Sequence, residues 1–264
     1  MSKYLHFIRA FMRNSFQREM AFRFNFFVNF LRTFIQLGVS LGGILIIFTQ
    51  VESLNGWALP EILALYGIYF FIQSLKDLVI GPSLESLAGM DGDLWVGRFD
   101  YTLLKPIPTQ FYVSFRNWRP WALIDMGLSI AIIVTAALKM KAVIASADIF
   151  FLIFSIAAAI TILYSVLLIL ISCAFWYLGT PLIWIYDSLI QTGRYPIKIY
   201  PGFMKFILTW IIPVGFIITV PAEVLLKRME LYQLLAGGVL AIILFTVSSL
   251  FFKGSIRKYS SASS

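Results

Sequence analysis

The feature that most constrains this chain is a run of 38 residues, between Asp148 and Asp187, without a charged side chain. At 1.5 Å of rise per residue, a helix of that length is about 57 Å long, nearly twice the roughly 30 Å hydrocarbon core of a bilayer. One straight membrane helix therefore cannot use the whole run. Either the run holds two spans joined by a tight turn near 171–173, or one long span is followed by an interfacial stretch that ends near Gly179 and Pro181.

The composition extends this conclusion to the whole chain of 264 residues. Hydrophobic residues make up 60% of it and charged residues only 13%, and the mean hydropathy is +0.87. Soluble domains carry about 25% charged residues, so disorder and a secreted disulfide scaffold are excluded. The net charge of +8 fits the cytoplasmic ends of membrane spans better than a nucleic-acid surface. The single cysteine, Cys173, excludes an internal disulfide and a multi-thiolate metal site.

Four further apolar stretches have the length of a membrane helix. They are residues 26–49, 57–80, 121–138 and 231–252. A fifth stretch, 206–226, is interrupted by prolines and a glycine, and such broken segments are tolerated at membrane depth only where protein covers them or they line a cavity. The sequence thus predicts an all-α integral membrane protein.

Two polar segments flank these spans. Residues 1–23 interleave basic and aromatic side chains, a pattern typical of an amphipathic helix that lies in the membrane interface. The longest polar interval, 81–120, separates the second and third spans. Pro82 and Ser83 can open a short amphipathic helix there, and the Asp91-Gly92-Asp93 triplet can end it.

Basic residues give the orientation, because they concentrate at cytoplasmic loops. With the N-terminus inside, 13 of the 21 basic residues fall on the inner face: Lys3, Arg9, Arg13, Arg18, Arg23, Lys76, Arg98, Lys105, Arg116, Arg119, Lys253, Arg257 and Lys258. The positions of three further basic residues, Arg194, Lys198 and Lys205, depend on the uncharged run. If the run is a hairpin of two spans, they fall on the outer face, which conflicts with this rule. If it is one span, they fall on the inner face.

The sequence lacks the residues of a membrane enzyme. His6 is the only histidine, and no cysteine pair or spaced carboxylate group could hold zinc or a di-metal centre. The phosphate-binding pattern GxxxxGK[ST] is absent. We therefore expect no enzymatic activity and no cofactor on this chain, so that any ATP and Mg²⁺ would bind a partner ATPase.

Few polar features lie inside the spans. Glu61, Asp125 and Asp187 each fall near a span end, where capping or contact with the interface explains a charge. Arg32 lies about two turns into the first span, where it can anchor the helix at the inner leaflet or pair across a subunit interface. Gly38 and Gly42 form a GxxxG pattern that permits close helix approach, although glycine is common in membrane helices. We interpret Arg32, Gly38 and Gly42 as candidates for an interface or a substrate path.

Two segments carry distinctive motifs. The stretch GRFDYTLLKPIPTQF follows the second span and contains the pattern Gly-x-x-Asp-x-x-Leu-x-x-Pro in Gly97, Asp100, Leu103 and Pro106. The stretch 194–226, before the last span, is punctuated by Pro196, Pro201, Pro213 and Pro221. Both segments resemble the matching parts of the permease subunits of bacterial type 2 ABC exporters.

This resemblance implies a specific architecture. It implies six spans, an amphipathic helix over 1–23 and a permease domain over 24–264. It also implies a cytoplasmic coupling region over 81–120 and an outer re-entrant helical pair over 193–228. The uncharged run would then hold spans 4 and 5. The short helix over 83–92 would be the coupling helix, with Leu84, Leu87 and Met90 seated in a groove of the ATPase and Glu85, Asp91 and Asp93 matching its charge.

The resemblance also implies partners and a function. Two cytoplasmic ATP-binding subunits, a second permease copy that is identical or related, and membrane lipids are the expected partners, with no nucleic acid. The chain would sit in a bacterial plasma membrane with both termini in the cytoplasm, and would export a hydrophobic or amphipathic substrate. The alternatives are a scaffold or assembly protein without transport activity, and an ion-coupled secondary transporter, which would need an inverted repeat and charged midplane pairs.

Overall fold

The fold was analysed in a computed structural model, which describes residues 2–21, 23–89, 91–140, 145–177 and 182–259. In this part of the chain every regular element is a helix, and the only β-type pairing is an isolated bridge between Leu54 and Trp57. Five helices are long and apolar enough to cross a membrane, and a bent helix pair would make a sixth. The prediction of an all-α membrane protein is confirmed.

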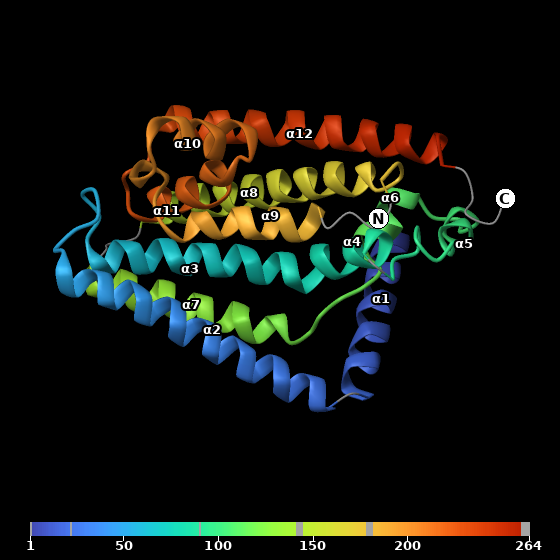
Figure 1. The fold of residues 1–264 in the computed structure, drawn as a ribbon, viewed down its shortest axis with the longest axis horizontal. Helices are drawn as coiled ribbons and strands as arrows, with labels where there is room; N and C mark the ends of the chain where they lie inside the picture. The colour runs from blue at the N-terminus through green and yellow to red at the C-terminus, as the bar shows by residue number, and fades with distance from the viewer. Residues whose placement is uncertain (1, 22, 90, 141–144, 178–181, 260–264) are drawn as a thin grey trace.

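The five long helices run along a common direction (Figure 1). They are α2 (Arg23–Gln50), α3 (Leu59–Leu75) with its extension, α7 (Ala122–Lys139), α8 (Ser146–Cys173) and α12 (Leu231–Arg257). We call the end of the bundle near α5 (Phe99–Leu103) the α5 end, and the opposite end the Asn55 end.

Carboxylates fix the start of two of these helices at the Asn55 end. The Glu61 side chain accepts a hydrogen bond of 2.9 Å from the backbone N–H of Ala58, one residue before α3, and Pro60 occupies the first turn of that helix. Asp148 accepts a bond of 2.9 Å from the N–H of Ala145 in the same way, one residue before α8. These bonds satisfy backbone donors that have no partner inside the helix.

The second span and the predicted short helix form one continuous element. The π-helical segment η1 (Lys76–Ile80) leads directly from α3 into α4 (Gly81–Ala88), so that 59–88 is a single 30-residue helix. The wider π turn accommodates Pro82, because a proline inside an α-helix clashes with the carbonyl four residues earlier. The separate helix that we expected over 83–92 is thus an extension of the second span that ends at Ala88.

The chain reverses direction within the uncharged run, after the end of α8. Helix α8 ends at Cys173, and α9 (Leu182–Ile190) packs beside it (Figure 1). The 3₁₀ turn η2 (Gln191–Arg194) then leads to Lys198, whose carbonyl accepts a bond of 2.7 Å from Asn55 at the Asn55 end. This path matches the hairpin and places Lys198 opposite α5. Gly179 and Pro181, the predicted end of the alternative interfacial stretch, lie outside the described residues, and six full spans stay a prediction.

The proline-rich segment forms a bent helical pair. Its first arm comprises α10 (Gly202–Phe206) and η4 (Ile207–Ile211), its second arm comprises η5 (Gly215–Thr219) and α11 (Val220–Leu225), and the arms bend by 77°. Both outer ends of the pair lie at the Asn55 end. Before it, Lys198 pairs with Glu223 of α11 at 2.9 Å, and after it, Arg228 pairs with Glu61 of α3 at 2.7 Å. A segment that enters and leaves at one end of the bundle has the geometry of a re-entrant loop.

Helix α1 (Ser2–Ala21) runs across the other helices at the α5 end (Figure 1). Its Tyr4 ring lies edge-on to Phe111 of α6 (Thr109–Phe115) with centroids 5.0 Å apart, and Ser15 Oγ accepts a bond of 3.0 Å from the Trp118 N–H. Its position along the membrane surface stays a prediction.

Helix α3 forms the centre of the bundle. Its Ile62, Leu65 and Ile68 are buried, and it packs along α7, while α8 packs along α12. Helix α2 lies at the periphery and exposes Phe27, Ile35 and many other large apolar side chains. Exposed apolar side chains of this kind suit contact with lipid rather than water.

Candidate functional site

A polar cleft lies within the apolar bundle, between α2, α3, α7 and α9. Its volume is about 340 Å³, and its walls are mostly polar. Four cations and four carboxylates line it: Arg32, Lys76, Arg119, Arg194, Asp77, Glu85, Asp125 and Asp187. Ionisable residues are costly among membrane helices and commonly mark a pathway for a polar solute or ion.

The cleft extends along the continuous helix α3–α4. Tyr69 and Glu85 both line it from the continuous helix α3–α4. The 16 positions between them correspond to about 24 Å along the helix axis. The polar wall therefore reaches from the α5 end deep into the bundle.

An ion pair across the cleft joins η1 to α9. Lys76 Nζ lies 2.6 Å from Asp187 Oδ1 and 3.3 Å from Asp77 Oδ1. Only 5% of the Lys76 side chain is exposed, compared with 26% for Asp187. Two carboxylates thus compensate the buried ammonium, an arrangement that a charge needs when it leaves water.

Two further polar contacts connect the walls of the cleft. Thr33 of α2 donates a hydrogen bond of 2.7 Å to Asp125 of α7. At the α5 end of the cleft, Arg119 pairs with Glu85 of α4. The four helices that surround the cleft are therefore joined by charged and polar side chains as well as by apolar packing.

Part of the polar lining has no partner. Arg32 and Arg194 form no ion pair with any described residue, and Arg194 Nε and Gln73 Oε1 are buried without a hydrogen bond in this part of the chain. The Arg194 guanidinium lies 5.5 Å from the centre of the Tyr69 ring. Arg32 is exposed and Arg194 is partly buried. The buried Arg194 Nε and Gln73 Oε1 atoms call for a hydrogen-bond partner, and the cleft offers two cations to an anionic group.

From the sequence, Asp125 and Asp187 are each expected singly at a span end, and the cleft is not predicted. The structure brings them together with Arg32, which lies on the same wall as Thr33. A local signal was present on the second span, where Gln73, Lys76 and Asp77 share one helix face by their i, i+3, i+4 spacing. We had assigned Lys76 to the inner face only.

The residues predicted for ATPase coupling lie largely inside the subunit. Leu84 and Leu87 of α4 are 1% and 0% exposed, and α4 packs against α6 and α8. An apolar face that is already covered in this way cannot also present itself to a groove of a partner. Of the charged residues, Glu85 is paired with Arg119 and Asp91 is exposed. Met90 lies outside the described residues.

Asp93 is held by two arginines of the same chain. It pairs with Arg116, whose side chain is 10% exposed, and with Arg98 at 3.3 Å. Arg116 also donates hydrogen bonds of 3.0 and 2.7 Å to Ser86 Oγ in α4. Arg116 therefore fastens the segment after α4 to the helix itself, and the carboxylate of Asp93 is used within the subunit.

The exposed apolar surface of this region lies on and beside α5. The α5 helix is anchored by Phe99, which is fully buried and contacts the rings of Phe175 and Tyr259 at 5.3 and 5.1 Å. Its opposite side is open, with Tyr101 70% and Leu104 80% exposed. We call Trp95, Val96, Tyr101, Leu103 and Leu104 the α5 surface.

The signature after the second span shapes this surface. Gly97 has a positive φ of 71°, a conformation that glycine adopts without strain. Asp100 stands in the first turn of α5, Leu103 ends the helix, and Pro106 lies exposed just beyond it. The signature thus makes the turn into α5 and sets its length.

The prolines of the second segment stand at the start of helical elements or at the break between them. Pro196 precedes η3 (Ile197–Ile199), Pro201 precedes α10, and Pro221 lies in the first turn of α11. Pro213 occupies the break between the two arms of the bent pair. Because proline has no N–H, it is tolerated at these helix starts and interrupts a helix elsewhere.

Gly38 and Gly42 face open space. A Cβ built on either glycine would meet no atom of this chain within 4 Å. Neither residue therefore mediates close helix packing within the described subunit, and this side of α2 is available to another chain. Among the described residues, no group of three His, Cys, Asp or Glu side chains could hold a metal ion.

Comparison with known proteins identifies a family. A family model described as ABC-2 family transporter protein matches residues 34–263. Neither the curated proteins nor the solved structures give a match to this chain.

Proposed function

The chain belongs to the ABC-2 transporter family, and on this premise we propose that it is the permease subunit of an ATP-driven exporter. Members of the family are multi-pass membrane subunits that work with separate ATP-binding subunits and are not themselves the ATPase. We propose a bacterial plasma membrane with both termini in the cytoplasm, which makes the α5 end the cytoplasmic end.

The polar cleft is the observation that carries the transport function. Of the eight ionisable side chains that line the cleft, Lys76 and Asp125 are buried, five are partly buried and Arg32 is exposed. Removing a charge from water is costly, so an apolar bundle gains no stability from the buried members of this set. Arg32 and Arg194, which form no ion pair with the described residues, suit the anionic part of an amphipathic substrate, while the exposed apolar face of α2 suits its hydrophobic part. A substrate of this class would move out of the cytoplasm or the inner leaflet.

ATP and Mg²⁺ would bind two partner ATPase subunits, and the permease would act as a pair of identical or related copies. We propose that the open face of α2 around Gly38 and Gly42 contacts the second copy, since small residues allow two helices to approach closely. The two permease copies, each with its own polar cleft, would then enclose the substrate route between them.

The α5 surface is the contact that we propose for the ATPase. Tyr101 and Leu104 project from a helix that the buried Phe99 fixes to the rest of the subunit. A push on α5 reaches α4 through Asp93 and Arg116, and α4 continues without a break into α3 and the cleft. The buried Leu84 and Leu87 would transmit this movement inside the subunit rather than touch the ATPase.

A scaffold protein without transport activity also explains an exposed α5 surface, although it gives no reason for the polar cleft. An ion-coupled transporter explains the cleft, but it does not require a contact at α5. One set of measurements on the same preparations separates the three functions: capture of an ATP-binding protein, stimulation of its hydrolysis, and transport.

The test uses the full chain, coexpressed with an ATP-binding protein from an adjacent reading frame and reconstituted in vesicles. We expect copurification, and ATP hydrolysis that the permease stimulates. Leu104→Asp should abolish both, whereas Leu104→Met keeps the apolar surface and should behave as wild type. Unchanged hydrolysis and transport in Leu104→Asp would refute the coupling surface, and transport without any ATPase would refute the proposed function.

A further inference from the structure

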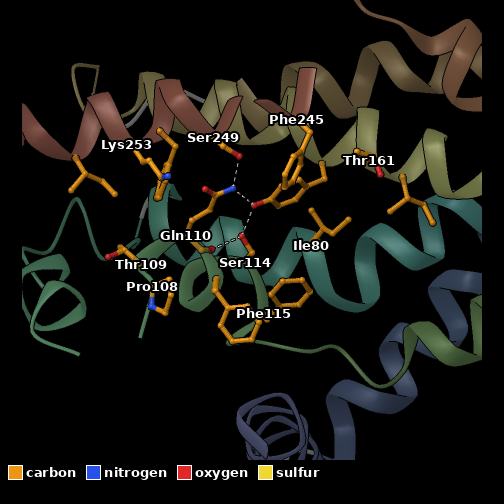
Figure 2. Close-up of a pocket in the computed structure, with 15 residues that line it drawn as sticks. Ile80, Pro108, Thr109, Gln110, Ser114, Phe115, Thr161, Phe245, Ser249 and Lys253 are labelled. Carbon is orange, nitrogen blue, oxygen red and sulfur yellow. Dashed lines mark hydrogen bonds between the residues drawn. The ribbon is translucent and has the colours of Figure 1, made fainter. Parts of the chain in front are cut away.

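A second pocket lies between α6, α8 and α12 (Figure 2). Its volume is about 850 Å³, and it is lined mainly by apolar side chains. Pockets that hold a small ligand measure roughly 300–1,000 Å³, so this one has room for a large part of an amphiphile. It lies apart from the polar cleft, which is formed by α2, α3, α7 and α9.

A hydrogen-bonded cluster forms the wall of this pocket. Gln110 of α6 donates bonds of 2.9 Å to Ser249 of α12 and 3.2 Å to the hydroxyl of Tyr164 in α8. Ser114 Oγ lies 2.8 Å from the same hydroxyl (Figure 2). These polar groups satisfy one another, and together they tie three elements into a preformed wall.

The rest of the pocket lining changes from apolar side chains at one end of the pocket to a cation at the other. On α12, Phe245 and Lys253 both line the pocket, eight positions apart, which corresponds to about 12 Å along the axis. Lys253 lies toward the α5 end, on the same side of the pocket as Thr109, whereas Phe245 and Thr161 lie on the other side (Figure 2). Lys253 is exposed and forms no ion pair with the described residues.

We propose that this pocket binds one phospholipid with an anionic headgroup. Its phosphate would lie at Lys253 and the hydroxyl of Thr109, and an acyl chain would follow the wall toward Phe245. The flanking surfaces of α8 and α12 expose Ile153, Ile242 and other large apolar side chains, so the pocket opens onto the bilayer. A basic side chain at the end of a membrane helix attracts anionic headgroups.

The position of the pocket gives the lipid a structural role. Gln110 and Ser114 belong to α6, which also packs against α4. A lipid seated between α6, α8 and α12 would hold the segment after α5 against the last span. This assignment does not depend on the substrate, since no residue of the polar cleft lines the pocket.

The test measures lipid binding to the purified full chain in detergent by native mass spectrometry. The probes are phosphatidylglycerol and phosphatidylcholine with identical acyl chains. Wild type should retain one phosphatidylglycerol more tightly than phosphatidylcholine. Lys253→Gln should weaken phosphatidylglycerol binding about fivefold, as expected for one basic side chain at a membrane surface, and should leave phosphatidylcholine unchanged.

Two further variants separate the pocket from general surface charge. Arg257→Gln removes a charge one turn further along the same helix, outside the pocket, and should weaken binding clearly less than Lys253→Gln. Thr161→Trp narrows the pocket and should lower the binding of both lipids. An equal loss in Arg257→Gln and Lys253→Gln would overturn the proposal.

A diazirine on the acyl chain of phosphatidylglycerol provides a readout that needs no variant. Labelled peptides from α8 and α12 around Thr161 and Phe245 would support the assignment. Labelling that avoids both helices, or protection of this face by a second copy of the chain, would overturn it.

Discussion

Lys76 and Asp187, 111 residues apart in the sequence, form an ion pair of 2.6 Å that joins the second span to α9 inside the polar cleft. The pair lies where the regular α-helix gives way to the π-helical segment at Lys76. Asp77 also contacts the ammonium, at 3.3 Å. Loss of Lys76 would therefore leave two carboxylates without their cation, whereas loss of either carboxylate would leave the other in contact with Lys76.

Replacement of this lysine tests its structural role. Lys76→Met leaves Asp187 and Asp77 without their cation, and breaking a buried pair costs about 3–5 kcal/mol. Because Asp187 is 26% exposed, we expect a loss near the lower limit, about 3 kcal/mol, measured as a lower unfolding temperature in detergent. Lys139→Met, which removes an exposed lysine with no ion pair among the described residues, should leave that temperature unchanged.

The double variant Lys76→Met/Asp187→Leu separates stability from transport. Replacing both charges by apolar side chains removes the cost of an unpaired buried charge, so the unfolding temperature should return toward the wild-type value. Transport should stay impaired, because the cleft has lost part of its polar wall. A double variant that transports at the wild-type rate would limit the pair to a structural role.

The sequence predicted the helical membrane fold because span length depends on local composition alone. The apolar runs of α2, α7 and α12 lie close to where they were expected, and the prolines stand at helix starts and at the bend of the broken pair. These features follow from bilayer thickness and from the missing N–H of proline, and neither requires knowledge of which helices are neighbours.

The direction of the apolar face of α4 could not be predicted in the same way. Leu84 and Leu87 have the spacing of an amphipathic helix, but this pattern does not distinguish a partner's groove from the subunit's own α6 and α8. The cleft could not be predicted from the sequence for the same reason. Its charged residues come from separate spans, and each one by itself is explained as a residue at the end of a span. In both cases the missing information is tertiary contact.

Substitutions at Leu84 and Leu104 test which side chains between α4 and α5 are buried and which are exposed. Leu84→Asp puts a carboxylate at a position that is 1% exposed, so we expect a loss of several kcal/mol or failure to fold. Leu104→Asp changes a residue that is 80% exposed and should alter stability by less than about 0.5 kcal/mol. Thermal unfolding of the isolated subunit checks both. Equal destabilisation by the two variants would contradict the burial described for α4.

Arg116 should not tolerate replacement by lysine. Its guanidinium contacts Asp93 and donates two hydrogen bonds to Ser86, and a single ammonium cannot reproduce this forked geometry. We expect Arg116→Lys to destabilise the subunit by about 1–3 kcal/mol and to increase protease cleavage between α4 and α5. Arg98→Lys is the matched control, because Arg98 is 63% exposed and contacts Asp93 from the surface; cleavage there should match wild type.

The bent helical pair should depend on Lys198 for its closure. Glu223 in α11 has only 3% of its side chain exposed, and Lys198 at 2.9 Å is the cation with which it pairs. Lys198→Met leaves this carboxylate buried and unpaired, which favours opening of the segment. Lys198 is itself 51% exposed, so we expect an effect of about 1.4 kcal/mol, or about tenfold faster amide hydrogen exchange across 215–225. Lys198→Met/Glu223→Gln should restore slow exchange, and Lys205→Met, at an exposed position of α10, should not alter it. If exchange stayed slow in Lys198→Met, apolar packing alone would hold the pair closed.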